Sequence, residues 1–172
     1  GGVYGDRAAA IERFIARYLE LPERAQRRLV LENDETSYSV MDTLTIHEQT
    51  GVSLVWDILH HRLNNPAHLG EAEACRLCLA TWPPGQVPKM HFSSPRGDAV
   101  PMDSEAVGEV TATRKGNPRQ HGDWIDGADF VAFMDEMEDA RFDVMLEAKQ
   151  KDLALLRLRE EIAAAGLRQR IW

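Results

Sequence analysis

The sequence predicts an α/β fold in which four short strands alternate with helices. Four apolar runs of strand length occur along the chain, and segments with helical apolar spacing separate them. Such alternation predicts a parallel sheet, because each helical crossover returns the chain to the same edge. Four strand–helix units make half of an eight-unit barrel, and 172 residues are few for a whole barrel of ~250. An open doubly wound sheet is the competing architecture.

Capping and breaking residues mark the expected helices. Asp6 carries the short carboxylate that caps a helix N-terminus, and Pro22 stops that helix at about Leu21. Gly51 suits the C-cap of a helix that begins at Ser39. The predicted helices span residues 6–21, 39–50, 71–82, 126–138 and 151–165.

The expected strands are the short apolar runs between these helices. They cover residues 29–31, 52–56, 89–92 and 142–146. A segment rich in Gly, Pro, Ser and Asp follows the third strand and is expected to form a long loop over 93–120. The whole chain, 1–172, is expected to be a single domain.

Composition excludes several classes of protein. The net charge of −8 argues against binding nucleic acid through bulk positive charge, although carboxylates can hold metal ions that face phosphates. No apolar run approaches the ~20 residues that span a bilayer, so no membrane association is expected. Cys75 and Cys78 form an isolated C-x-x-C motif, which predicts buried thiols on a helix in a reducing, cytoplasmic compartment. The dinucleotide-binding and P-loop glycine motifs are missing from the sequence.

Each predicted strand delivers residues of metal-ligating type at or just past its C-terminal end. In a parallel barrel these ends converge on the active-site face, so a metal centre is predicted there. Mixed imidazole and carboxylate ligands suit Mn²⁺, Zn²⁺ or Fe²⁺ better than Ca²⁺, and such ions can hold a phosphate and activate water. Taken singly, each residue has an ordinary structural alternative, such as a helix cap or a core histidine. The candidate ligands are Glu32, Asp57, His60, His91, Glu147 and, after the long loop, His121.

Lys89 is a further candidate for this site. It lies two residues before His91, and residues i and i+2 of a strand share a face. The interpretations are a phosphate contact, a carboxylated lysine, or a salt bridge to a carboxylate. The other histidines, His47, His61 and His68, are expected to be structural or exposed.

Several short motifs, in this order, resemble the UV damage endonuclease family over nearly the whole chain. The resemblance implies a barrel nuclease of DNA repair that nicks damaged double-stranded DNA 5′ to ultraviolet photoproducts. It also implies a cluster of divalent metals, most often Mn²⁺, with Mg²⁺ or Zn²⁺ as alternatives. The matching stretches are G-V-Y-G-D-R (2–7), L-E-N-D (31–34), D-x-x-H-H (57–61), P-K-M-H-F-S (88–93), H-G-D-W-I (121–125) and M-L-E-A-K (145–149).

Carried over motif by motif, the resemblance assigns roles to individual residues. Lys89 corresponds to a lysine that is carboxylated beside the metals, and it joins Glu32 and Glu147 as catalytic candidates. The implied reaction is metal-assisted hydrolysis of a phosphodiester bond. The residues that correspond to metal ligands are Glu32, Asp57, His60, His91, His121 and Glu147.

The chain departs from the family pattern in two respects. The match begins just after the place of another histidine ligand, so the isolated chain is expected to hold part of the metal shell and to be weak or inactive as a nuclease. A half barrel also leaves strand edges open, which favours self-association.

The second departure is the segment between His91 and His121, which is longer than expected. It is either an unstructured insertion or a DNA contact through Arg96, Arg114, Lys115 and Arg119.

Two other functions fit the pattern less well. A barrel sugar isomerase or epimerase also uses carboxylates and histidines at strand ends to bind a divalent metal. A non-catalytic binding module could retain the fold alone. The L-E-N-D and M-L-E-A-K motifs favour the endonuclease.

Overall fold

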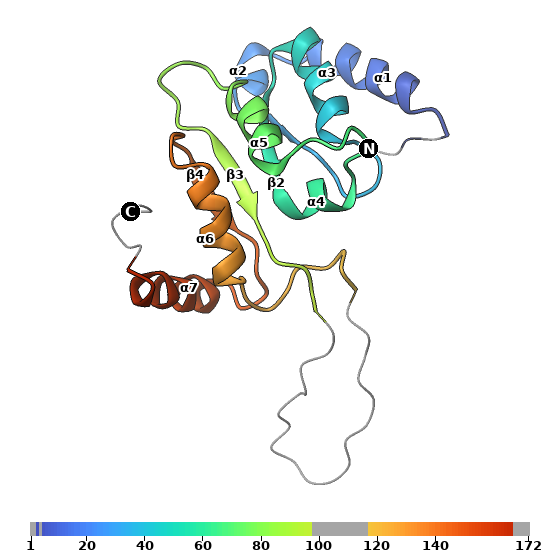
Figure 1. Ribbon diagram of the computed structural model, residues 1–172. Coiled ribbons are helices and arrows are strands. Elements are labelled where there is room, and N and C mark those ends of the chain that lie inside the picture. Colours follow the sequence, from blue (N-terminus) through green and yellow to red (C-terminus); the bar gives the residue numbers. More distant parts are fainter. Residues whose placement is uncertain (1–2, 4, 98–116, 167–172) are drawn as a thin grey trace.

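A four-stranded parallel sheet forms the framework of the computed structural model, which describes residues 3, 5–97 and 117–166 (Figure 1). The strands are β1 (Val30–Glu32), β2 (Ser53–Asp57), β3 (Lys89–Phe92) and β4 (Asp143–Leu146). They pair in chain order, and every pair is parallel. This sheet and its helical crossovers confirm the predicted α/β class and four parallel units of a partial TIM-barrel-like fold.

Helices connect and flank the strands. α1 packs beside α3, and α6 packs beside α7 (Figure 1). Within the described residues, no helix is both long enough and apolar enough to cross a membrane. The helices are α1 (Arg7–Leu19), α2 (Glu23–Gln26), α3 (Val40–Thr50), α4 (Ile58–Leu63), α5 (Glu71–Leu79), α6 (Gly127–Glu136) and α7 (Asp152–Ala164).

The predicted caps lie where the structure begins and ends its helices. The Asp6 carboxylate accepts a hydrogen bond from the Ala9 amide at 3.0 Å, and the Asp126 carboxylate caps α6 in the same way. Gly51 ends α3 with a φ of 72°, a conformation that glycine adopts without steric cost. The short helices α2 and α4 were not predicted, because four and six residues are too few to show a helical period.

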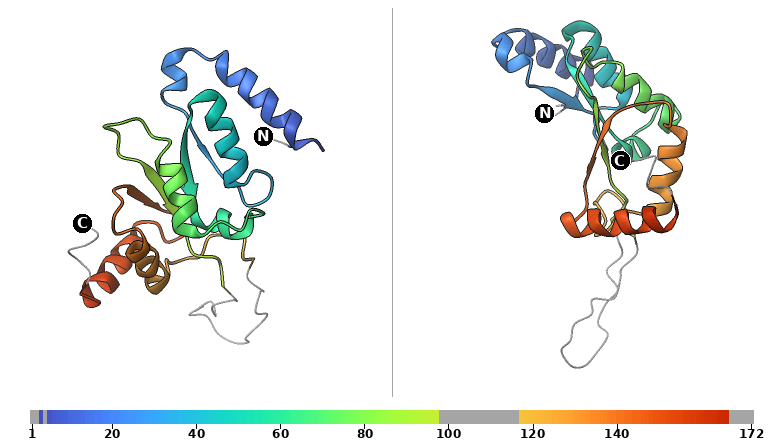
Figure 2. Two further views of the ribbon diagram at one scale, coloured as in Figure 1. Left: turned by 45° about the horizontal axis from the view of Figure 1, so that its top comes forward. Right: turned by 90° about the vertical axis from the view of Figure 1, so that its left-hand side faces the viewer.

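The helices α5 and α6 cover one face of the sheet (Figure 2). Trp56 of β2 stacks on Phe133 of α6 with ring centroids 5.4 Å apart, and Phe92 of β3 meets Phe130 edge-on at 5.0 Å. Along β3 the buried residues Met90 and Phe92 alternate with Lys89 and His91. The opposite face of the sheet therefore carries the polar side chains of the strands.

The C-x-x-C motif lies in this apolar layer. Cys75 and Cys78 are free, buried thiols on α5, as predicted. Burial raises the pKa of both thiols, that of Cys78 to about 12. A thiol with so high a pKa is a poor nucleophile and a poor metal ligand at neutral pH.

Candidate metal centre

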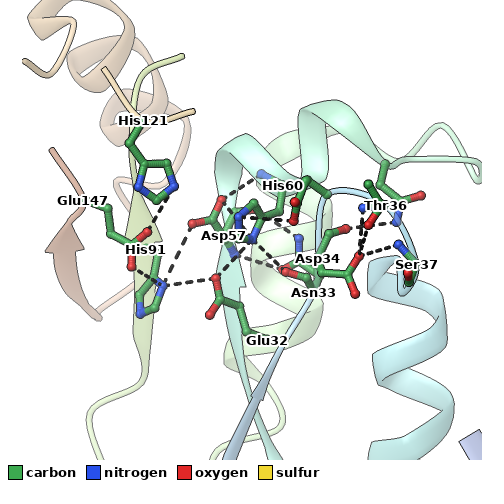
Figure 3. Close-up of polar contacts among 12 residues, drawn as sticks. Glu32, Asn33, Asp34, Thr36, Ser37, Asp57, His60, His91, His121 and Glu147 are labelled. Carbon is green, nitrogen blue, oxygen red and sulfur yellow. Dashed lines mark hydrogen bonds and ion pairs between the residues drawn. The ribbon is translucent and has the colours of Figure 1, made fainter. Parts of the chain in front are cut away.

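The predicted ligands converge at the C-terminal edge of the sheet (Figure 3). Glu32 and Asp57 are the last residues of β1 and β2, and Glu147 directly follows β4. The parallel register pairs Asp57 with His91, which sets these two residues side by side on neighbouring strands. Strand pairing alone therefore brings together residues that are far apart in the sequence.

Glu32, Asp57 and His91 form the centre of this cluster. Each offers one ligand atom, and these atoms all lie within 4.8 Å of one another. The His91 Nδ1 atom lies 3.2 Å from Glu32 Oε1 and 4.0 Å from Asp57 Oδ2. Two carboxylates and one imidazole at this spacing match the oxygen and nitrogen donors of a Mn²⁺ or Zn²⁺ site.

The Asp57 carboxylate gives a second indication that this cluster suits a cation. Its side chain is 0% exposed, and Oδ1 accepts a hydrogen bond from the His60 amide at 2.8 Å. The other oxygen, Oδ2, is buried and has no hydrogen-bond partner among the described residues. Burial raises the pKa of this carboxyl, because desolvation penalises its charged form. A cation at Oδ2 would compensate that cost, so the residues present fit a divalent metal.

Glu32 lies between two imidazoles and holds both in place. Its Oε1 atom is 3.2 Å from Nδ1 of His60 and 3.2 Å from Nδ1 of His91. Burial opposes ionisation of Glu32, but hydrogen bonds from the two imidazoles outweigh it and lower its pKa to about 2. Burial likewise opposes protonation of His60, yet the Glu32 hydrogen bond and the Asp57 charge raise its pKa to about 9. The hydrogen bond to Glu32 also raises the pKa of His91.

Glu147 extends the cluster to the far side of His91. Its Oε1 atom lies 3.2 Å from His91 Nδ1, and its Oε2 atom lies 3.4 Å from His121 Nε2. His121 comes from the end of the long loop, where it forms an isolated antiparallel bridge with Pro95. The Gly122 amide donates to the Ser94 carbonyl at 2.7 Å, which holds this segment against the end of β3. A continuous set of contacts thus runs from Glu32 to His121.

Lys89 shares the polar face of β3 with His91 but does not contact the cluster. Its Nζ atom lies 3.0 Å from Asp143 Oδ2, and its side chain is 48% exposed. The β3–β4 register pairs the two residues directly. This is the salt bridge considered as the alternative for Lys89, so its catalytic role stays a prediction.

Two residues of the site had no role in the sequence reasoning. Asn33 is buried and exchanges hydrogen bonds with the backbone of Asp57. Glu35 places Oε2 at 3.9 Å from His60 Nε2. Both follow Glu32 within three positions. Asn33 belongs to the L-E-N-D motif, whereas Glu35 lies just after it and no motif singled it out.

The remaining histidines have structural or exposed positions. His61 is buried, its Nε2 atom is 3.1 Å from the Leu69 carbonyl, and its ring lies 5.5 Å from that of Trp56. His47 is half-buried rather than on the surface, and its Nδ1 atom lies 2.8 Å from the Val52 carbonyl. His68 is exposed.

Of the basic residues predicted to contact phosphates, two are described. Arg96 is fixed by a hydrogen bond to Gln120, and Arg119 is exposed near His121. Arg114 and Lys115 lie outside the described residues.

Comparison with known proteins points to one family. A family model described as UV-endonuclease UvdE matches residues 1–169. A UV DNA damage endonuclease of Bacillus velezensis is 34% identical over 168 residues, and one of Bacillus pumilus is 32% identical over 174 residues. These alignments cover 95% and 99% of this chain but 47% and 49% of the relatives. The chain therefore spans about half the length of the relatives it matches.

A solved structure agrees with the sequence comparison. The structure titled "Crystal Structure of SacUVDE" superposes with a TM-score of 0.75 at 28% identity. The match covers 96% of this chain and 50% of that one. The likeness in fold therefore extends over nearly the whole chain.

Proposed function

Because the chain belongs to the UV-endonuclease UvdE family, we propose that it acts in DNA repair as a metal-dependent endonuclease. Its proposed substrate is damaged double-stranded DNA, nicked 5′ to ultraviolet photoproducts. The observation that carries the proposal is the cluster of Glu32, Asp57 and His91, extended by Glu147 and His121. All these residues lie at the C-terminal edge of a parallel sheet, where barrel enzymes place their active sites.

The proposed ligands divide into an inner group and a flanking group. Glu32, Asp57 and His91 would hold one divalent ion. His60 lies 3.2 Å from Glu32 and Glu147 lies 3.2 Å from His91, whereas His121 reaches the inner group only through Glu147, at 3.4 Å. Mn²⁺ is the proposed ion, because three imidazoles and three carboxylates together favour it over Ca²⁺. When bound, such an ion supplies Lewis-acid stabilisation of phosphate charge and activates water.

The residues of the chain have distinct tasks in this proposal. Glu32 orients His60 and His91 through its shared oxygen atom, and Glu147 orients His91 and His121. Asp57 contributes a fixed charge from a fully buried position. Such preorganised groups stabilise the transition state because they need no rearrangement during the reaction.

Lys89 is proposed as a further catalytic residue. It lies on the face of β3 that carries His91, and Asp143 neutralises its ammonium group in this structure. Reaction of the deprotonated Lys89 amine with carbon dioxide, with loss of one further proton, would form a carbamate anion and so abolish the ion pair with Asp143. Mass spectrometry of the native chain should then detect an added carboxyl group that is absent from the Lys89→Arg variant.

Self-association is the remaining proposal about partners. Within the described sheet, β1 and β4 each pair with one neighbour only. Val30 on β1 is 46% exposed and Met145 on β4 is 52% exposed, so both edges present apolar side chains. Open strand edges of this kind favour pairing. A single monomeric species in sedimentation at high concentration would contradict it.

Metal titration and a nicking assay test the main proposal separately. Calorimetry with Mn²⁺ should detect binding to the chain, and Glu32→Gln should weaken it by at least about tenfold. Glu48→Gln, an exposed change on α3, is the matched control and should bind like the unaltered chain. Equal binding by Glu32→Gln would contradict the metal centre. Nicking of ultraviolet-irradiated plasmid with saturating Mn²⁺ should be weak, because the chain spans about half the length of its relatives, and it should disappear in Glu32→Gln. Nicking that persists in this variant would contradict the proposed role of the metal centre.

A further inference from the structure

A groove of about 650 Å³ lies beside the metal centre, with Glu147 and His121 in its wall. Three basic residues, Arg119, Lys149 and Lys151, line it too, together with the uncharged Gln120, Leu146 and Ala148. The three basic residues are exposed. We call this feature the cationic groove, and its shared wall makes it continuous with the candidate metal centre.

Two separate segments build the cationic groove. Arg119 precedes His121 at the end of the long loop, whereas Lys149 and Lys151 belong to the turn between β4 and α7. The Lys149 amide donates to the Gly122 carbonyl at 3.0 Å, and the Gln150 amide donates to the Asp123 carbonyl at 3.1 Å. The backbone therefore fixes the two segments relative to each other.

The charges of the groove are not neutralised from within the described part of the chain. Arg62, Arg76 and Arg157 each lie within 3 Å of a carboxylate. For Arg119, Lys149 and Lys151, in contrast, the described residues offer no ion pair. Among the described residues of the groove, these three cations outnumber the one carboxylate, that of Glu147, so the groove is complementary to an anion although the net charge of the chain is −8.

Lys151 occupies a backbone position that a lysine rarely adopts. Its φ is 49° and its ψ is −120°, a conformation that glycine reaches far more easily. Two turns enforce it, because the Lys151 amide donates to Ala148 O and the Leu153 amide donates to Gln150 O, both at 3.0 Å. Glycine would suit this backbone conformation better, so the stability of the fold does not explain the lysine at position 151.

We propose that the cationic groove binds backbone phosphates of the DNA strand that crosses the metal centre. This inference rests on the proposed endonuclease function and adds the residues that position the substrate. Contacts to phosphates fix the register of a protein on DNA without reading its sequence. The cationic groove would therefore hold the strand in place while Glu32, Asp57 and His91 bind the metal.

The test measures binding of a fluorescently labelled duplex by anisotropy in EDTA, over about 50 to 200 mM salt. Lys151→Gly, Lys149→Gln and Arg119→Gln should each weaken binding and reduce the slope of log K against log salt by about one. The losses should be equal for undamaged and irradiated duplexes. Lys151→Gly should also keep or raise the melting temperature, because it relieves the backbone. Arg28→Gln, an exposed change just before β1 at the opposite edge of the sheet, is the matched control.

The outcomes separate this inference from the proposed function. An unchanged salt slope in all three groove variants would overturn it, as would a chain that binds no duplex. A chemical acetylation experiment gives a further outcome. If inorganic phosphate protects the groove lysines from acetylation and duplex DNA does not, the site binds a free anion and the inference is wrong. Because EDTA removes divalent metal, failure of Mn²⁺ binding would not affect these results. If the chain binds Mn²⁺ but the groove variants keep the salt slope of the unaltered chain, the proposed phosphate contacts are wrong and the proposed metal centre is not affected.

Discussion

Asn33 and Asp57 exchange two hydrogen bonds across the neighbouring ends of β1 and β2. The Asn33 Nδ2 atom donates to the Asp57 carbonyl at 3.1 Å, and the Asp57 amide donates to Asn33 Oδ1 at 2.9 Å. Both residues are buried, and the Asn33 carbonyl also lies 2.9 Å from His60 Nδ1. Asn33 therefore sets the positions of two candidate ligands without being one itself.

Removing the Asn33 side chain should weaken metal binding as well as the fold. Asn33→Ala leaves the buried amide and carbonyl of Asp57 without partners, which should cost about 1–3 kcal/mol of unfolding free energy. The displaced ligands should lower Mn²⁺ affinity by about 10- to 100-fold. Urea unfolding in EDTA and calorimetry with Mn²⁺ measure the two effects.

Asn65 provides a matched control for this experiment. It also exchanges two hydrogen bonds with a backbone, donating to Leu69 O at 2.8 Å and accepting from the Leu69 amide at 3.0 Å. Asn65→Ala should therefore reduce stability but leave Mn²⁺ affinity unchanged. If both variants lose affinity equally, Asn33 has no special connection to the site.

The convergence of the ligands could be predicted from the sequence because one simple rule governs it. Parallel strands present their C-terminal ends at one edge, so Glu32, Asp57 and His91 had to approach once four strands were recognised. The apolar runs and caps that mark those strands are local signals. The β3–β4 register, in contrast, decides that Lys89 meets Asp143, and strand register depends on packing across the whole sheet.

Other features of the site depend on contacts that leave no local signal. Asn33 lies in the L-E-N-D motif, but no local feature shows that its side chain pairs with Asp57, which is 24 positions away in the sequence. The helix α4, which carries His60, is only six residues long, too short to show a period. The cationic groove depends on the placement of residues 119–123 against 148–151, which the sequence alone does not fix.

The stability of the metal-free chain should depend on the protonation of His60. Its pKa rises from 6.5 to about 9 on folding, so the folded state binds the proton more tightly than the unfolded chain. Stabilisation is therefore complete below about pH 6.5 and is lost as the pH rises through about 9, with a total on the order of 3 kcal/mol. The lowered pKa of Glu32 reflects the same pairing with His60. It therefore adds nothing further to the change in unfolding free energy between about pH 6.5 and about pH 9.

Urea unfolding in EDTA at about pH 6.5 and about pH 9.5 measures this loss. His60→Gln should reduce the dependence, with the remainder due to His91, whose pKa is also raised; His68→Gln changes an exposed loop residue and should retain the full dependence. If the unfolding free energy of His60→Gln depends on pH as fully as that of the unaltered chain, a group other than His60 causes the loss and the prediction is wrong.

Gly122 allows the His121 segment to pack against the end of β3. A Cβ atom at this position would lie 3.1 Å from Ser94 O, 3.2 Å from Trp124 O and 3.3 Å from Pro95 O. All three are backbone atoms, so they yield less easily than a side chain would. Gly122→Ala should cost about 1–3 kcal/mol of unfolding free energy and weaken Mn²⁺ binding, because His121 is its neighbour.

Gly70→Ala is the appropriate comparison for Gly122→Ala. A Cβ atom at Gly70 would meet nothing within 4 Å, and the residue is the N-cap of α5 and follows none of the proposed ligands directly. This variant should lose about 1 kcal/mol or less and keep its Mn²⁺ affinity. Equal affinities in the two variants would show that the site does not depend on the close approach at Gly122.

Arg62 ties the helix that carries His60 to two other helices. Its guanidinium lies 2.7 Å from Glu71 at the start of α5 and 2.7 Å from Asp129 in α6, with a second hydrogen bond to each carboxylate. Lysine keeps the charge but cannot form two forked pairs at once, so Arg62→Lys should lower the unfolding free energy by about 1–2 kcal/mol. Arg17→Lys alters a pair on the solvent-exposed surface of α1 and should change it by less than about 0.5 kcal/mol. Urea unfolding distinguishes the two, and equal losses would mean that the forked geometry of Arg62 contributes nothing beyond its charge.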